Sequence, residues 1–184
     1  MNKTVINEIT RLKQLMNIKE SLGGVKFRKY SPETDFETVF SRLPEIFSKL
    51  GDQWTSELIW SNIAPVNQEL SIIAEVDGEI AGFYFINDEP IMPGGDEEVY
   101  EKLSQLTGVE GVALGVFNEY KNLGIGKMLI DYPKSLGVDY IWGYQLKALD
   151  NINDWLKRRK IYVQTPGLYV TYQIFNDNEE NISN

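Results

Sequence analysis

The spacing of hydrophobic and polar positions predicts several helices in the first third of the chain. Apolar residues recur every three or four positions over 4–22, and Gly23-Gly24 supplies a stop. The same spacing runs over 36–50, where Pro44 predicts a kinked helix or two short ones. Residues 54–63 continue the pattern. This part of the chain is therefore expected to be mainly helical.

Segments rich in β-branched and aromatic residues predict the strands. From Val25, apolar and charged side chains alternate, as in a short half-buried strand that ends at the turn residues Ser31-Pro32. Residues 70–76 and 80–86 carry strand composition on either side of Asp77-Gly78, a dipeptide that favours tight hairpin turns. These two segments predict a β-hairpin.

The middle of the chain predicts a βαβ unit. Strand-like residues 109–117 are followed by a glycine-containing helix start over 124–132 and by another strand-like run over 138–146. Such a unit places its strands parallel, with a right-handed crossover. Before it, residues 87–107 form an insert, with a loop and then a helix over 96–106, that is a candidate lid.

The last third predicts one helix and a return to β structure. Residues 152–161 have helical spacing, and 162–175 read as strand with a turn at Pro166-Gly167. The polar residues 176–184 predict a disordered tail. This order of elements predicts a mixed α/β fold.

The length of 184 residues predicts one domain with a substantial core. We expect that domain over 25–175, with 1–24 as a helical extension and 176–184 as the tail. The extension is amphipathic, so it either packs on its own domain or docks a partner or a second copy as a homodimer.

Composition narrows the chemistry. The chain has no cysteine and no histidine, which excludes zinc sites of the common types, cysteine nucleophiles and serine–histidine triads; no metal is expected. No apolar run approaches the ~20 residues that span a bilayer, and the first 16 residues lack the apolar core of a secretory signal. We expect a cytoplasmic protein without membrane insertion.

Charge argues against a nucleic-acid partner. The formal net charge is −9, whereas phosphate backbones are bound by clustered basic residues. One basic run occupies 157–160, at a predicted helix C-terminus. It either complements the helix dipole or contacts the phosphates of a cofactor.

The most informative stretch follows the strand at 109–117. Gly124 and Gly126 let the backbone approach a ligand, and free N–H groups at a helix start suit an anionic diphosphate. Met128 after Lys127 does not fit a P-loop, and the glycine spacing does not fit a dinucleotide fingerprint. The residues alone leave a phosphate loop and a plain strand-to-helix turn both open.

Three segments in order carry a family resemblance. Lys121-Asn-Leu-Gly124-Ile-Gly126 resembles the acyl-CoA loop of the GNAT acyltransferases, with Lys in the place of the usual Gln or Arg. The hairpin at 70–86 is similar to the second and third strands of that family. Residues 25–39 are similar to its first strand and first helix. The resemblance spans 25–172 and implies a twisted, mixed central sheet flanked by helices, to which the N-terminal helix and the 87–107 insert are additions.

The resemblance implies a set of acetyl-CoA-binding residues. The strand before the loop would hold the pantetheine and thioester, and the loop would hold the diphosphate. These residues are Leu114, Gly115, Val116, Lys121, Asn122, Leu123, Gly124, Ile125, Gly126 and Lys127.

Acyl transfer to an amine also needs a base and an acid. Several family members carry a catalytic Glu near the position of Glu110, which makes it the candidate base; the alternative is an exposed strand-end carboxylate. The tyrosine that often serves as acid is missing from "WLKRRKIY", which puts Trp155-Leu156 in its place. Tyr162 is the substitute candidate, although an aromatic residue at strand spacing is more often part of the core.

The sequence therefore favours an N-acetyltransferase that uses acetyl-CoA and acts on the primary amine of a small molecule, peptide or protein. The acidic chain would attract a cationic acceptor. The alternative is a GNAT-fold binding or structural protein that has lost turnover and acts through a partner. A transferase of longer acyl or aminoacyl groups is the third possibility.

Overall fold

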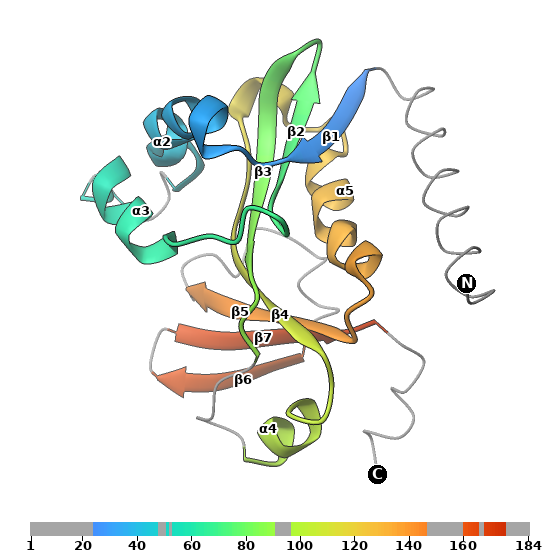
Figure 1. The fold of residues 1–184 in the computed structure, drawn as a ribbon. Coiled ribbons are helices and arrows are strands. Elements are labelled where there is room, and N and C mark those ends of the chain that lie inside the picture. Colours follow the sequence, from blue (N-terminus) through green and yellow to red (C-terminus); the bar gives the residue numbers. More distant parts are fainter. Residues whose placement is uncertain are drawn as a thin grey trace, which may run out of the picture.

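The computed structural model describes residues 24–47, 51, 53–90, 97–146, 160–165 and 168–175, and for 145, 146, 160–165, 168 and 169 the backbone only. Within these residues, one seven-stranded sheet has the order β1-β2-β3-β4-β5-β7-β6 (Figure 1). Its strands are β1 (Val25–Lys29), β2 (Ile72–Val76), β3 (Glu79–Asn87), β4 (Gly108–Val116), β5 (Tyr140–Leu146), β6 (Lys160–Thr165) and β7 (Leu168–Ile174). The helices are α2 (Pro32–Phe47), α3 (Ser56–Ile63), α4 (Glu97–Leu103) and α5 (Ile125–Asp131), with 3₁₀ turns η2 (Asn118–Tyr120) and η3 (Tyr132–Leu136).

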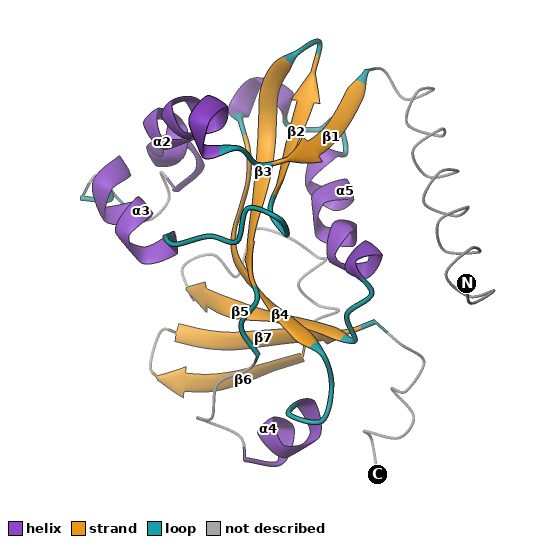
Figure 2. Cartoon of the chain, viewed as in Figure 1, coloured by secondary structure: helices purple, strands orange, loops and turns teal. Residues whose placement is uncertain are grey.

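The first four strands form an antiparallel unit with helices on both faces (Figure 2). α2 and α3 pack on one face, where Phe83, Phe85 and Phe117 are fully buried among their apolar residues. α5 packs on the other face through Ile125 and Leu129. Burial on both faces explains why β3 is apolar along almost its whole length instead of alternating.

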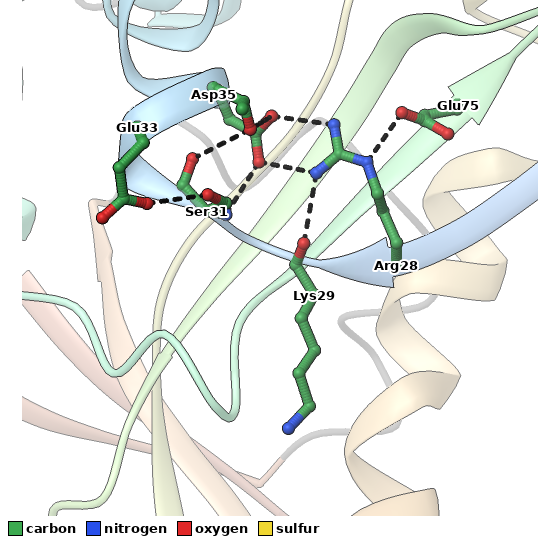
Figure 3. Close-up of polar contacts among 7 residues, drawn as sticks. Arg28, Lys29, Ser31, Glu33, Asp35 and Glu75 are labelled. Atoms are coloured by element: carbon green, nitrogen blue, oxygen red, sulfur yellow. Dashed lines mark hydrogen bonds and ion pairs between the residues drawn. The ribbon is translucent and has the colours of Figure 1, made fainter.

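An ion pair between the partly exposed Arg28 and the buried Asp35 ties β1 to the start of α2 (Figure 3). Arg28 donates two hydrogen bonds of 2.7 Å to the Asp35 carboxylate, which is 1% exposed, and a third of 2.7 Å to Glu75 on β2. Asp35 also accepts from the Ser31 N–H at 2.8 Å and from the Thr34 hydroxyl at 2.9 Å. These bonds satisfy the carboxylate and fix the angle at which α2 leaves the strand.

The second half of the sheet contains β5, β7 and β6, in which the central strand β7 runs antiparallel to both of its neighbours. Tyr140 and Trp142 of β5 form a separate cluster with residues of β7 and with Leu103 of α4. α4 therefore belongs to the packing of this half, against the face of β5 that Tyr140 and Trp142 share.

The two halves meet at β4 and β5, which run parallel as the βαβ pattern predicts. Among described residues, these strands pair only over Gly108–Glu110 and Tyr140–Trp142. A Cβ on Gly143 would lie 2.5 Å from the carbonyl oxygen of Gly111, so two glycines allow the strands to touch where the pairing ends. Beyond this point β4 continues toward the glycine loop, and β5 turns away from it (Figure 1).

Most predicted elements are confirmed, with one correction. Of the two alternatives for 36–50, the structure has a single helix: α2 includes Pro44, and it starts at Pro32, where proline lacks only an N–H that a first-turn residue does not need. The helix predicted over 152–161 is wrong at its end, because Lys160 already belongs to β6. The rest of that helix, the basic run at 157–159, the predictions over 1–23 and the tail at 176–184 lie outside the described residues.

Candidate functional site

On the side from which β5 has diverged, strand β4 has backbone groups that pair with no strand among the described residues. The Phe117 N–H donates to the Ala81 carbonyl at 2.9 Å, and backbone groups alternate in direction along a strand. The N–H and C=O groups of Leu114 and Val116 therefore face away from β3, while those of Gly115 face it. No β5 residue that the structure describes pairs with this part of β4.

A β-bulge lies between these groups and the paired end of β4. Phe85 pairs with Ala113 and Ile86 with Gly111, so Val112 is an extra residue in the ladder. A Cβ on Gly111 would lie 2.4 Å from the buried Tyr84 hydroxyl and 3.0 Å from Ile141. Glycine at 111 thus allows the close packing of β3, β4 and β5 beside the bulge.

The loop after β4 turns sharply into α5. Asn122 (φ 68°) and Gly124 (φ 77°) both adopt the left-handed conformation, and Gly124 is the residue before the first turn of α5. Ile125 is buried against the sheet and anchors the helix, whereas Lys121, Leu123 and the loop between them are exposed. The first N–H groups of α5 thus face outward beside the end of β4.

Gly126 connects the loop to the strand. A Cβ at this position would lie 3.7 Å from a methyl group of Val116, which is an ordinary contact. The backbone of α5 at Gly126 therefore lies over the end of β4, next to the outward-facing groups of Val116. Lys127, one residue further on, is exposed.

Side chains of α2 hold the other end of this loop. The Arg42 guanidinium lies 3.7 Å from the centre of the Phe117 ring and donates to Glu119 at 2.6 Å. Arg42 also pairs with Glu45 at 2.7 Å, and Glu45 accepts the N–H of Asn118. The hydrogen bond from Arg42 lowers the pKa of Glu119, which acts here as a structural tether.

Glu110 lies on the face of the sheet opposite α5. Its neighbour Val109 packs with Ile125 and Leu129, and side chains alternate along a strand. Its register partner on β5 is Trp142, which packs toward α4. Glu110 is partly buried within the strand, so it is not an exposed strand-end carboxylate.

The surroundings of Glu110 raise its pKa. Burial is the main cause, the negative charge of Glu89 adds to it, and a hydrogen bond with the side chain of Asn87 opposes it. The Trp142 indole N–H donates to the Glu89 carbonyl at 2.8 Å and holds this acidic segment beside β5. The ring of Tyr144, 46% exposed, packs edge-on against Trp142 at 5.4 Å.

No protein-family model matches the sequence, and no curated protein matches it either. Solved structures do resemble the fold. PaiA N-acetyltransferase from Thermoplasma acidophilum, in complex with coenzyme A, aligns with a TM-score of 0.54 and 17% identity over 83% of this chain and 99% of that chain. A GNAT family acetyltransferase from Brucella melitensis, in complex with acetyl-CoA, aligns with a TM-score of 0.53 and 18% identity over 83% of this chain and 88% of that chain. Naa50 from Arabidopsis thaliana, bound to a bisubstrate analogue, aligns with a TM-score of 0.53 and 15% identity over 83% of this chain and 99% of that chain.

The chain has the GNAT fold. The match covers nearly all of each of these acetyltransferase chains at low identity, so it extends to the arrangement of elements and not to individual residues. The twisted mixed sheet flanked by helices, implied by the sequence resemblance, is confirmed.

On this GNAT fold, the predicted acetyl-CoA-binding residues lie together and the two predicted catalytic residues do not. Residues 114–116 end β4, and residues 121–127 form the loop after η2 and the first turn of α5. Tyr162 lies on the edge strand β6, and two strands separate β6 from β4. At about 4.8 Å per strand, the backbone of Tyr162 is about 14 Å from β4.

Sequence reasoning missed two polar residues near Glu110 and the bulge. Tyr84 was interpreted only as a strand residue, although its hydroxyl reaches Gly111, and Asn87 was interpreted as the start of a loop. A tyrosine within an apolar strand is the one sequence signal for the first. The second required the β3–β4 register, in which Asn87 faces Glu110.

Within the described residues, no group of three or more acidic side chains could hold a metal ion. No helix in that part of the chain is long and apolar enough to cross a membrane.

Proposed function

We propose that this protein is an N-acetyltransferase that transfers the acetyl group of acetyl-CoA to a primary amine by direct attack. The observation that carries this proposal is the end of β4, where backbone groups without a strand partner among the described residues lie next to a left-handed loop at a helix start. When bound, acetyl-CoA supplies an activated thioester. All other roles are assigned below to residues of this chain.

The backbone of the site fits the extended arm and the diphosphate of acetyl-CoA. Leu114 and Val116 direct their N–H and C=O groups to the diverged side, where an amide-containing arm could pair like an added strand. The loop from Lys121 to Lys127 adds exposed N–H groups and two cationic side chains for the diphosphate. Small Gly126 leaves room above Val116.

Glu110 is the proposed base. It faces away from α5 and its loop, so the acceptor amine would approach from the face covered by α2, α3 and α4. The carboxylate would take a proton from the amine, directly or through one water, as nitrogen attacks the thioester carbonyl and forms the carbon–nitrogen bond. The carbon–sulfur bond would then break, and CoA would leave as a thiolate that takes a proton from water. The environment that raises the pKa of Glu110 makes it a stronger base than an ordinary glutamate.

Nearby acidic and aromatic groups favour a cationic acceptor. Glu89 lies close enough to act on Glu110 through its charge, and the exposed ring of Tyr144 lies beside Trp142 on the same face. Two carboxylates and an aromatic ring suit the binding of the acceptor's ammonium group before that group loses its proton.

A thiol-release assay tests this function. Purified protein is incubated with acetyl-CoA and a panel of amines, including a polyamine, an aminoglycoside and lysine- and N-terminal-amine peptides, and free CoA is measured over time. We expect CoA release that depends on one class of amine and falls by about 10²- to 10⁴-fold in Glu110→Gln. Lys134→Gln, a change at an exposed position in η3, serves as the control.

The second candidate is a GNAT-fold binding protein without turnover. The missing tyrosine in the "WLKRRKIY" segment favours it. Tight acetyl-CoA binding with no CoA release for any amine, in the presence or absence of Glu110, would select this alternative.

A further inference from the structure

Asn87 bridges the backbone of a neighbouring turn and the Glu110 carboxyl. It is the last residue of β3 and the register partner of Glu110 on β4. Its side-chain oxygen accepts the N–H of Asn67 at 3.0 Å, and its side chain is also hydrogen-bonded to Glu110. One amide thus connects a fixed backbone group to the proposed base.

The contact with Asn67 sets the direction of the Asn87 amide. An asparagine side chain has one oxygen that accepts and one NH₂ group that donates. An ionised carboxylate can only accept hydrogen bonds, so its bond with Asn87 comes from the NH₂ group, while the Asn87 oxygen accepts the Asn67 N–H. The geometry therefore presents a donor, and not an acceptor, to Glu110.

The turn that carries Asn67 is itself well held. The Asn67 N–H also contacts the Ile86 carbonyl at 3.1 Å, and its side-chain oxygen accepts the N–H groups of Glu69 and Leu70 at 3.0 and 3.3 Å. Ser71, immediately after the turn, bonds Ile86 through its buried hydroxyl at 2.9 Å. Asn87 is thus oriented by a network of backbone bonds.

A charged group, Glu89, also acts on Glu110. Its charge disfavours a second carboxylate beside it, whereas a donated N–H favours one. Trp142, from β5, donates its indole N–H to the main-chain carbonyl of Glu89 and carries no charge. Asn87 therefore lowers the pKa of Glu110, whereas Glu89 raises it.

We propose that Asn87 is a positioning residue for the reaction: its NH₂ group holds the Glu110 carboxylate toward the acceptor face and keeps it ionised beside Glu89. This proposal rests on the proposed function, because it assigns Glu110 the role of base. It adds a residue that neither the sequence motif nor the fold comparison indicates.

The sharpest variant is Asn87→Asp. It has the same shape and keeps an oxygen for the Asn67 N–H, but it replaces the donor facing Glu110 with a second oxygen. Asn87→Ala removes the donor without adding charge. Asn62→Ala, at an exposed asparagine on α3, is the matched control.

The first readout is the titration of Glu110 by carbon-13 NMR of glutamate carboxyls, with its signal assigned by its loss in Glu110→Gln. We expect the pKa to increase from wild type to Asn87→Ala by about 0.5–1 unit, and to increase further in Asn87→Asp, where the two carboxyls titrate as a pair. Asn62→Ala should leave it unchanged. An unchanged or lowered pKa in both Asn87 variants would overturn the proposal.

The second readout uses the amine that gives the fastest CoA release. The acid limb of kcat/KM against pH should move to higher pH in the same order as the NMR values, with kcat reduced more than KM for the amine. A moved NMR titration with an unmoved acid limb would reduce Asn87 to a structural role. Failure of wild type to bind acetyl-CoA would instead refute the proposed function, so the two failures are distinguishable.

Discussion

Replacing Arg28 by methionine should destabilise the fold more than the loss of a surface ion pair would. Arg28 is the partner of a carboxylate that is 1% exposed, and methionine keeps a similar apolar stem while removing the guanidinium. Asp35 would then keep two donors, the Ser31 N–H at 2.8 Å and the Thr34 hydroxyl at 2.9 Å. A buried carboxylate would lose its only counter-charge in the network.

The size of the effect follows from the burial of the two partners. Leaving one charge of a buried pair uncompensated costs about 3–5 kcal/mol. Arg28 is itself 36% exposed, so water screens part of the pair and the expected loss of unfolding free energy is about 2–3 kcal/mol. Lys134→Met, which removes an exposed pair with Asp131, should cost less than about 0.5 kcal/mol.

The pH dependence gives a second test. Burial would raise the pKa of Asp35, but the hydrogen bonds from Arg28, Ser31 and Thr34 outweigh it and the pKa is lowered from its ordinary value of 3.8. A depressed pKa in the folded state contributes stability that is present above 3.8 and is lost as pH falls through the folded value. In Arg28→Met this contribution is gone, so the difference from wild type should narrow below about pH 4.

Urea denaturation followed by tryptophan fluorescence at pH 7.5 and at pH 4 and below measures both effects. If Arg28→Met lost less than about 1 kcal/mol of unfolding free energy at pH 7.5, no more than Lys134→Met, the dominant role of the Arg28–Asp35 pair would be refuted. A loss that does not change with pH would refute the role of the Asp35 charge.

Three further predictions follow from the site. Gly111→Ala should lower the unfolding free energy by about 1–3 kcal/mol because its Cβ would meet a tyrosine hydroxyl at 2.4 Å, whereas Gly126→Ala, with a 3.7 Å contact, should stay within about 0.5 kcal/mol; urea denaturation compares them. Arg42→Met should free the loop tether at Glu119 and weaken acetyl-CoA binding several-fold by calorimetry, and unchanged affinity would contradict this. Because the pKa of Glu110 is raised, the acid limb of kcat/KM should lie above the ordinary value of 4.5 and vanish in Glu110→Gln.

Local signals in the sequence were sufficient for the hairpin and the βαβ unit. Asp77 (φ 53°) and Gly78 (φ 87°) are both left-handed, as the turn preference of this dipeptide requires, and their flanking residues form β2 and β3. The parallel β4–β5 pair follows from chain connectivity alone. Both features depend on neighbours in sequence, which a single chain displays directly.

The arrangement around Glu110 depends on contacts between distant residues and was not predictable in the same way. Gly143 of β5 contacts Gly111 of the neighbouring strand β4, and Asn87 lies opposite Glu110 because a bulge at Val112 sets the register. The helical spacing over 152–161 was misleading at its end, where pairing of Lys160 with Tyr172 on β7 selects a strand. Tertiary pairing overrides local periodicity at such positions.

The most direct test of the central claim is calorimetric titration with acetyl-CoA of wild type and Gly126→Glu. The single variant is preferred to one at Gly124, whose left-handed conformation would strain any side chain, and Gln105→Glu adds the same charge at an exposed site near α4 as control. The account predicts micromolar binding by wild type and by Gln105→Glu, and its loss in Gly126→Glu with the fold intact. Folded wild type that does not bind acetyl-CoA, or a Gly126→Glu protein that binds as tightly as wild type, would contradict it.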